Sequence, residues 1–576
     1  MTEKVIVNVK EGRVRGFKSK TAYSGVEYYT FLGVPYGQST AGSARFKDPV
    51  KAKPWTHILD ATVEKGGCRQ FAMWRKETIG SEDCLYNNIY TPKIPSKGDP
   101  LKAVIVFIHP GALTNGSPDP SSFGAPDYIM HKEVVYVCVA YRLHILGFLN
   151  LHLKTCSGNQ GLKDIILSLQ WIKENISSFG GDPDNVTLMG SSSGSLLVHY
   201  LLLSPLAKGL YHKAVLMGVY AFCPVSVIPP ENVSIAHKMA QSIGYDGQPG
   251  ENKKLLRFYK SLDFFGFLVK RPESFFEETT IQVYPVSPFM LTSEPGENSP
   301  IPVSPKKLIP STNRVPVLIG FCEKEAIMGV AILRDRGAFK TSIKNTFYKA
   351  IRQNHFGWGA ALEEEELKII QKEVENFYLA GNAIETATDS VLCDILTDAA
   401  LSDVYDSLIN VISADLPSSV FVYNFLYDGK LCMLKPRMTR LLGKELPGAC
   451  HATENCYWSY IDENTVGKNM NRIQLKDRQM IETFTSMLTT FAKNSNPNYK
   501  EMEVEWKPTN PDHPSHLIID EKLEVKDGLL NGDRMEFWHK LKNQFQKVRE
   551  NLHTKPNDVA NGSLLGGTEP EISNRV

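Results

Sequence analysis

The segment Gly190–Gly194 has the spacing of a catalytic serine. It reads Gly-Ser-Ser-Ser-Gly and fits the G-x-S-x-G pattern, with Ser192 at the centre. In enzymes with this pattern the serine lies on a sharp turn between a strand and a helix, and its hydroxyl attacks an acyl carbon. Glycines on both sides leave room for a turn that is too tight for side chains. The alternative is a plain Ser/Gly helix cap, which the local residues alone do not exclude.

A serine hydroxyl needs a base to become a nucleophile, and the base needs an acid that orients it. The chain has 14 histidines. Those that follow Ser192 and could act as the base include His199, His355, His451 and His513. His199 falls on the helix expected after the turn, where packing is the usual role of a histidine. Spacing alone does not choose among the others.

The residues around this segment predict the elements that such a turn requires. Residues 186–189 form a short apolar run typical of a buried strand, and residues 193–203 have the pattern of a helix. Apolar residues also recur at three- and four-residue spacing through 162–176, which predicts an amphipathic helix. The Gly-Gly-Asp-Pro sequence at 180–183 is expected to end that helix.

Other apolar runs extend the pattern along the chain. Further strands are predicted at 103–108, 134–140, 315–319 and 420–423, and a late helix carries Met480, Phe484, Met487 and Phe491 on one face. Strands that alternate with helices predict an α/β protein with a mostly parallel sheet. The sequence predicts one domain over residues 1–550 and a disordered tail over 551–576, where Asn, Gly, Pro and Ser dominate.

Composition limits the partners of the chain. The 576 residues are 42% hydrophobic, and 64 Lys and Arg against 63 Asp and Glu give a net charge of +1. Because the charges balance, the chain has no strong positive electrostatic field that would attract nucleic acid, so no nucleic-acid partner is expected. No apolar run approaches the ~18 residues of a transmembrane segment. The N-terminus has no apolar stretch of a secretory signal, so a cytoplasmic location is expected.

The ten cysteines are scattered and form no CxxC pair, which argues against a zinc ribbon. Cys68 and Cys84 are close enough in sequence to close a short loop. A reducing cytosol is expected to keep them as thiols.

Several longer motifs occur in an order that points to a family. They are Tyr-Thr-Phe-Leu-Gly-Val-Pro-Tyr-Gly at 29–37, Arg-Phe at 45–46, Ser-Glu-Asp-Cys-Leu-Tyr at 81–86, Gln-Gly-Leu-Lys-Asp at 160–164, Trp-Ile at 171–172, Phe-Gly-Gly-Asp-Pro at 179–183, and the serine motif itself. Over roughly residues 5–545 the chain resembles the type-B carboxylesterase and cholinesterase family, most of all the insect cytosolic α-type carboxylesterases. The resemblance implies one α/β-hydrolase domain, with insertions that form a deep active-site gorge, and Ser-Glu-His catalysis.

The resemblance assigns the catalytic residues one by one. Ser192 matches the nucleophile of the family. The segment Gly-Phe-Cys-Glu-Lys-Glu-Ala at 320–326 resembles the one that carries the acid, which places the acid at Glu325, with Glu323 nearby in the same loop. The segment Gly-Ala-Cys-His at 448–451 resembles the one that carries the base, which is then His451. Cys450 beside it is expected to be a bystander.

The oxyanion loop of the family normally reads His-Gly-Gly-Gly-Phe, whereas here residues 109–113 read His-Pro-Gly-Ala-Leu. The resemblance assigns oxyanion donation to the backbone N–H groups of Gly111, Ala112 and Ser193. Alanine keeps its N–H, but the added Cβ is expected to crowd the acyl oxygen. Pro110 lacks an N–H, and the first glycine of the family motif is not a donor.

Other positions also depart from the family pattern. Ser191 stands where the family commonly has glutamate, Ser193 where it has alanine, and Gly218 where it has a serine that supports the acid. Glu454 keeps a family acidic position. Trp74 lies at a spacing like that of the cholinesterase tryptophan that stacks on choline. A gorge-wall or surface aromatic is the favoured interpretation of Trp74, because the acidic neighbour at position 191 is missing.

The resemblance therefore implies a serine carboxylesterase that hydrolyses uncharged carboxylic esters of xenobiotic, insecticide, lipid or hormone-like type. Detoxification and reaction with organophosphates would follow from that chemistry. No metal or organic cofactor is implied, and the only partner expected is a small-molecule ester. The alternative is a catalytically weak or inactive cholinesterase-like binding or scavenger protein, whose relatives usually lack a triad member.

Overall fold

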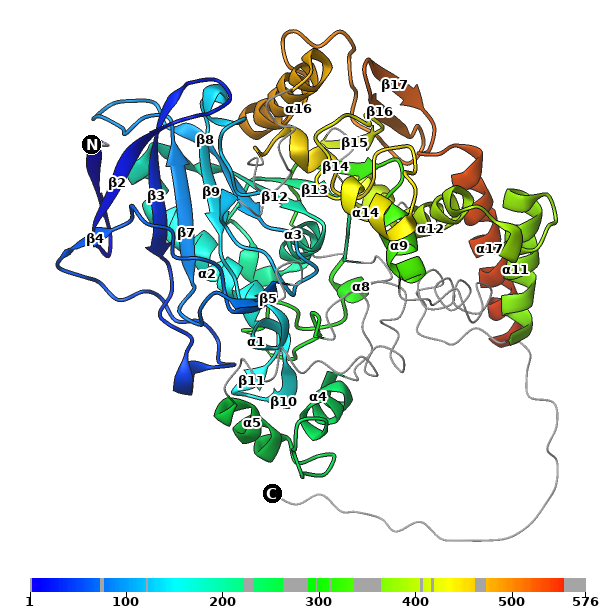
Figure 1. Cartoon of the computed structure of the whole chain (residues 1–576), viewed down its shortest axis with the longest axis horizontal. Coiled ribbons are helices and arrows are strands. Elements are labelled where there is room, and N and C mark those ends of the chain that lie inside the picture. The colour runs from blue at the N-terminus through cyan, green and yellow to red at the C-terminus, as the bar shows by residue number, and fades with distance from the viewer. Residues whose placement is uncertain are drawn as a thin grey trace, which may run out of the picture.

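The computed structural model describes residues 3–72, 77–120, 123–221, 232–262, 289–296, 298–309, 313–335, 364–404, 408–415, 419–460 and 473–553. A 13-stranded sheet runs through this part of the chain in the order β1-β2-β3-β7-β9-β8-β12-β13-β14-β15-β16-β17, with β4 paired to β2 (Figure 1). Its strands are β1 (Lys4–Val9), β2 (Gly12–Lys20), β3 (Glu27–Pro35), β4 (Ile58–Asp60), β7 (Tyr86–Thr91), β8 (Lys102–Ile108), β9 (Val135–Val139), β12 (Gly181–Ser191), β13 (Lys213–Met217), β14 (Val317–Cys322), β15 (Val420–Phe425), β16 (Ser515–Ile519) and β17 (Leu523–Asp527).

The middle of the sheet is parallel. Strands β9, β8, β12, β13, β14, β15 and β16 pair with their neighbours in parallel, whereas β1, β2, β3 and β7 form an antiparallel edge and β17 closes the other edge. The predicted large, mostly parallel sheet is confirmed. Because parallel strands end at the same side of a sheet, the loops after β8, β12, β14 and β15 meet there, as in other open α/β folds.

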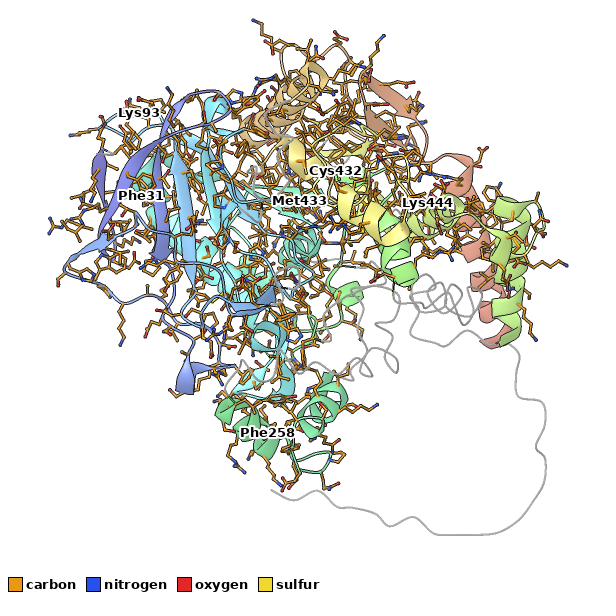
Figure 2. The ribbon with its side chains drawn as sticks, viewed as in Figure 1. Phe31, Lys93, Phe258, Cys432, Met433 and Lys444 are labelled. Carbon is orange, nitrogen blue, oxygen red and sulfur yellow. A yellow bond between two sulfur atoms is a disulfide. The ribbon has the colours of Figure 1, made fainter. Side chains whose placement is uncertain are left out.

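Helices cover both faces of the sheet, and others lie beyond it (Figure 1). They are α1 (His144–Phe148), α2 (Gln160–Asn175), α3 (Ser193–Leu203), α4 (Asn232–Gln241), α5 (Asn252–Ser261), α8 (Pro305–Leu308), α9 (Ile327–Asp335), α11 (Glu364–Leu379), α12 (Asp389–Val404), α13 (Asn410–Asp415), α14 (Lys435–Leu442), α16 (Leu475–Asn494) and α17 (Asp533–His553). Two short hairpins, β5 (Gln70–Ala72) with β6 (Glu77–Ile79) and β10 (Asn150–Leu153) with β11 (Cys156–Ser157), lie outside the large sheet. Phe258 of α5 lies near the bottom of the view in Figure 2, well below Cys432 and Met433, which precede α14.

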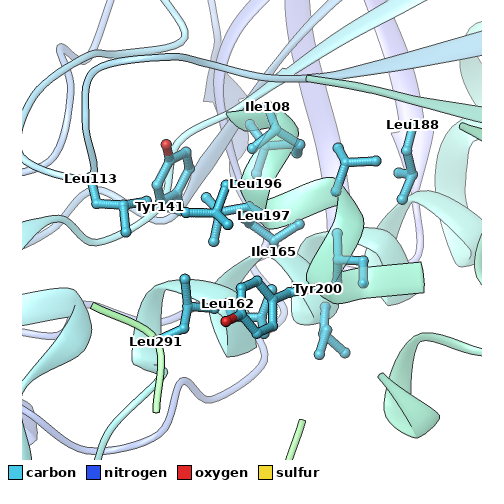
Figure 3. Close-up of a cluster of buried hydrophobic side chains, with 14 of the residues drawn as sticks. Ile108, Leu113, Tyr141, Leu162, Ile165, Leu188, Leu196, Leu197, Tyr200 and Leu291 are labelled. Atoms are coloured by element: carbon cyan, nitrogen blue, oxygen red, sulfur yellow. The ribbon is translucent and has the colours of Figure 1, made fainter. Parts of the chain in front are cut away.

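The core has two layers because the central strands are buried on both faces. Val104, Val106 and Ile108 of β8 belong to one buried cluster, and Ile105 and Phe107 belong to the other. This alternation is the period of two residues of a β-strand. Apolar side chains of α2 and α3 cover the first face, and Figure 3 shows Leu162 and Ile165 beside Leu196 and Leu197 below Ile108. Side chains of α16 cover the second face.

The predicted helices fit the structure better than the predicted strands. The expected helix at 193–203 is α3, and the expected late helix is α16. Residues 186–189 were expected to form a short strand, but β12 begins at Gly181 and continues to Ser191. The register against β8 shifts between Gly181 and Val186, so the polar start of β12 is an irregular extension that apolar residues alone do not reveal.

Cys68 and Cys84 form a disulfide. The expectation of two free thiols was therefore wrong. It rested on the compartment assumed for the chain, whereas the fold brings residues 68 and 81 together in a β-bridge and so places the two sulfurs within bonding reach. Among the described residues, no helix is both long enough and apolar enough to cross a bilayer. The expected tail falls almost entirely outside the described residues, and α17 reaches His553.

Candidate active site

Ser192 lies on a strained turn between β12 and α3. Its backbone has φ 54° and ψ −125°, a conformation that a residue with a side chain rarely adopts. The flanking glycines are required, because a Cβ on Gly190 would lie 2.4 Å from the backbone of Gly194, and one on Gly194 would lie 2.0 Å from the Ile108 carbonyl oxygen. The strain is held in place by the Ser192 N–H, which donates to the Met217 carbonyl at 2.8 Å.

Ser192, His451 and Glu325 form a continuous line of hydrogen bonds. The Ser192 Oγ lies 2.8 Å from the His451 Nε2, and the His451 Nδ1 lies 2.5 Å from the Glu325 Oε2. A carboxylate only accepts hydrogen bonds, so it selects the tautomer with the proton on Nδ1. The free lone pair of Nε2 then faces the serine hydroxyl, which is the arrangement that proton abstraction needs.

The loop after β14 separates the two candidate acids. Residues 323–326 form a turn rather than an extended segment, so Glu323 and Glu325 do not point the same way. The Glu325 Oε1 accepts the Cys322 N–H at 2.9 Å, which fixes the carboxylate toward His451. Glu323 lies against Gly448 instead, where an added Cβ would come within 2.7 Å of its Oε2. A backbone bond from the Lys324 N–H to the Ala449 carbonyl ties the two loops together.

Burial and charge act against each other at His451. Burial on its own would lower the pKa of His451, but the carboxylates of Glu325 and Glu454 outweigh it and raise the pKa above its usual value. Burial also raises the pKa of Glu454 to about 7, helped by repulsion from Glu325. Cys322 bridges the two carboxylates, since its N–H donates to Glu325 and its thiol donates to the Glu454 Oε2 at 2.6 Å.

The loop at 109–113 follows β8 and lies beside the Ser192 turn. Gly111 has φ 131°, and a Cβ there would overlap the Asn115 carbonyl oxygen at 1.8 Å. Ala112 and Leu113 take φ values of 55° and 59°, which favour glycine, so the departures from the family loop are accommodated at a cost in backbone strain. Leu113 is buried against the core and Tyr141 in Figure 3, which anchors the loop.

The three assigned oxyanion donors lie where N–H groups are free. Within the described part of the chain, the N–H groups of Gly111 and Ala112 form no hydrogen bond with the protein. Ser193 is the first residue of α3, and the first N–H groups of a helix have no partner within it. The positive end of the α3 dipole adds to the attraction for a negative oxygen.

Gly218 lies beside the His451–Glu325 pair and contributes no side chain to it. A Cβ on Gly218 would lie 3.1 Å from the His451 Cε1 and 3.7 Å from the Glu325 Oε1. The serine that the family places here would therefore reach the acid. Gly218 has a φ of 89°, which suits glycine better than a residue with a side chain.

Sequence reasoning missed one residue of the site, Asn455. Its Nδ2 donates to the Ser191 Oγ at 2.7 Å, and its Oδ1 accepts the Trp458 Nε1–H at 3.1 Å. The only signal in the sequence was the unusual serine at position 191, which by itself does not identify its partner.

Two expectations concern residues outside the described part of the chain. Trp74 is one of them, so its place at the site stays a prediction. The gorge also stays a prediction, because segments 263–288 and 336–363 are likewise not described. Among the residues that are described, no group of three or more His, Cys, Asp or Glu side chains is arranged to hold a metal ion.

Comparison with known proteins identifies the family of this chain. The model of the carboxylesterase family matches residues 3–538. Esterase FE4 of Myzus persicae is 31% identical over 525 residues, which cover 89% of this chain and 88% of that protein. Juvenile hormone esterase of Tribolium castaneum is 28% identical over 85% of this chain and 84% of that protein.

A solved structure extends the similarity to three dimensions. The crystal structure of juvenile hormone esterase from Manduca sexta, with OTFP covalently attached, has a TM-score of 0.79 and 25% sequence identity. The match covers 94% of this chain and all of that chain, which confirms the predicted α/β-hydrolase fold. Each of these relatives is a named esterase and the matches cover most of the chain, so this protein is a carboxylic ester hydrolase that belongs to the carboxylesterase family.

Proposed function

We propose that this protein is a serine carboxylesterase that hydrolyses uncharged carboxylic esters through an acyl-enzyme on Ser192. The observation that carries the proposal is the line of hydrogen bonds from Ser192 through His451 to Glu325. These are the three residue types that the mechanism needs, in the order nucleophile, base and orienting acid.

In the acylation step, the His451 Nε2 takes the proton of the Ser192 hydroxyl while the Oγ bonds to the ester carbonyl carbon. Negative charge moves to the carbonyl oxygen, where the N–H groups of Gly111, Ala112 and Ser193 donate hydrogen bonds. Donors of this kind are each worth about 10²–10³ in turnover. The tetrahedral intermediate then collapses, the bond to the alkoxide breaks, and His451 returns the proton to the departing alcohol.

Deacylation repeats these steps with water. His451 takes a proton from water, the hydroxide oxygen attacks the acyl carbon, and the carboxylic acid leaves as the proton returns to the Ser192 Oγ. Glu325 stays ionised and stabilises the imidazolium that forms in both halves of the reaction. A binding or scavenger protein without turnover is not favoured, because all three residues are present and in contact.

The proposed substrates are apolar esters of xenobiotic, insecticide, lipid or hormone-like type, which fits a role in detoxification. Support comes from the named activity of the juvenile hormone esterases among the relatives and from the neutral residue at position 191. The likeness to α-type enzymes and the cytoplasmic location stay predictions. The Cys68–Cys84 disulfide counts against the cytoplasm, because disulfides persist mainly in oxidising compartments.

Aliphatic and aryl esters are expected to be better substrates than choline esters. A cation beside the nucleophile would gain from a carboxylate at position 191, but Ser191 is neutral and its Oγ already accepts a hydrogen bond. Comparing kcat/KM for p-nitrophenyl butyrate and butyrylthiocholine tests this preference. A higher value for the choline ester would show that the substrate class is wrong. No hydrolysis of either ester would favour the binding or scavenger protein.

A further inference from the structure

The Asn455 side chain connects the turn that carries Ser192 with the loop that carries His451. Asn455 lies in the short helix Glu454–Tyr457, four residues after His451, and Ser191 directly precedes Ser192. The Asn455 Nδ2 donates to the Ser191 Oγ at 2.7 Å. Ser191 is 1% exposed and Asn455 0%, so water does not compete for this bond.

Trp458 fixes the direction of the Asn455 amide. An indole N–H only donates, so the atom that accepts it at 3.1 Å must be the amide oxygen. The amide nitrogen then necessarily faces Ser191. Trp458 is itself fully buried and packs edge-to-face on Phe107 of β8, with ring centroids 4.7 Å apart. The amide is thus held between Ser191 at the end of β12 and Trp458, which packs on β8.

We propose that Asn455 is a positioning residue that keeps His451 in line with Ser192 through its bond to Ser191. This inference rests on the proposed function of the two residues. The Ser192–His451 bond has to break and re-form during each turnover, because the proton moves along it. The Asn455–Ser191 bond involves no reacting atom, so it can hold the same two segments together throughout the reaction.

Ser191 accepts the Asn455 bond without adding a further carboxylate to a region that already holds a buried acid. Glu454, next to Asn455 in the chain, is fully buried and its pKa is raised by burial and by Glu325. A hydroxyl acceptor at position 191 adds no further negative charge to this region. The serine that replaces the family glutamate at position 191 is thus matched by the Asn455 amide, which donates a hydrogen bond to it.

Ser191→Ala tests the proposal, since it removes the acceptor and leaves the buried Nδ2 without a partner. The expected result is a fall in kcat of about 10-fold, because small displacements of a catalytic group have large effects on rate. KM should stay within about twofold, since Ser191 is not expected to touch substrate. The pH at the midpoint of the acid limb should not move, because the charges around His451 are unchanged. Ser191→Thr keeps a hydroxyl and should restore most of the kcat.

Ser168→Ala is the matched control. The Ser168 Oγ donates to the Asn87 Oδ1 at 2.7 Å, and both residues are fully buried away from the catalytic loops. Ser168→Ala should lower the thermal midpoint about as much as Ser191→Ala does, and it should leave kcat unchanged. The proposal is overturned if Ser191→Ala keeps kcat within about twofold of the parent enzyme, if Ser168→Ala loses as much kcat, or if Ser191→Thr fails to restore it in folded protein.

Ser192→Ala, measured in parallel, separates this inference from the proposed function. If Ser192→Ala is inactive and Ser191→Ala is normal, only the positioning role of Asn455 is wrong. If Ser192→Ala keeps its activity, the proposed function fails, and the inference fails with it.

Discussion

Replacing Ser192 by alanine is expected to abolish ester hydrolysis and to leave the fold intact. The hydroxyl is the only group removed, and it accounts for the bond that forms to the substrate. Loss of a serine nucleophile costs on the order of 10⁴–10⁶ in turnover. The strained backbone at φ 54° is held by Gly190, Gly194 and the bond to Met217, none of which the substitution touches. The measurement is kcat on p-nitrophenyl butyrate with purified variant, alongside its thermal midpoint.

Ser168→Ala provides the control for Ser192→Ala as well, because it removes a buried hydroxyl of the same size. It should keep the parent rate. If a folded Ser192→Ala variant hydrolysed the ester at a near-parental rate, another residue would have to be the nucleophile. The line of hydrogen bonds at the site would then have a purely structural role.

Glu325→Gln is expected to be the second most damaging substitution, with Glu323→Gln as its matched partner. A neutral amide at position 325 no longer stabilises the imidazolium, and it can present an N–H to the His451 Nδ1 and favour the wrong tautomer. The comparable change in a well-studied serine protease costs ~10⁴ in turnover. The effect here is expected to approach that value, somewhat reduced because Gly218 already gives the acid no side-chain support.

Glu323→Gln should lose far less activity. Glu323 lies against Gly448, and its N–H donates to the Phe425 carbonyl at 3.0 Å, whereas Glu325 contacts His451 directly. Steady-state kcat for both variants, with thermal unfolding to check that they fold alike, decides between them. If the Glu323 variant were the inactive one, the acid would be two residues earlier than proposed, and Ser192 and His451 would keep their roles.

The fold was predictable where apolar residues dominate. Runs such as 103–108 and 134–140 are buried on both faces of a parallel sheet, so nearly every residue in them is apolar and the strand is easily recognised. The antiparallel edge was not predicted, because strands such as β2 (Gly12–Lys20) are mostly half-buried and contain several charges. The polar start of β12 was missed for the same reason.

The site was predictable only in part. The glycines around Ser192 are a local signal, because the turn itself requires them. Glu325 and His451 lie 133 and 259 residues further along the chain, and only the order of the parallel strands brings them to Ser192. Resemblance supplied these positions where spacing could not. The turn that separates Glu323 from Glu325 depends on the bond from the Cys322 N–H, which no sequence pattern reveals.

The role of Asn455 was not predictable for a similar reason. A buried amide is recognisable only through its partners, and Ser191 and Trp458 reach it from different parts of the fold. The positive φ at Ala112 and Leu113 was equally hidden, because residues of these types rarely adopt that conformation.

Phosphorylation by an organophosphate tests the central claim, an activated serine at position 192, most directly. The Ser192 Oγ would attack phosphorus, the leaving group would depart, and a phosphoryl oxygen would take the place of the oxyanion near Gly111 and Ala112. Intact-protein mass spectrometry is expected to show one adduct per chain, peptide mapping should place it within 190–194, and Ser192→Ala should take up none. An adduct on a tyrosine, or equal labelling of Ser192→Ala, would contradict the account.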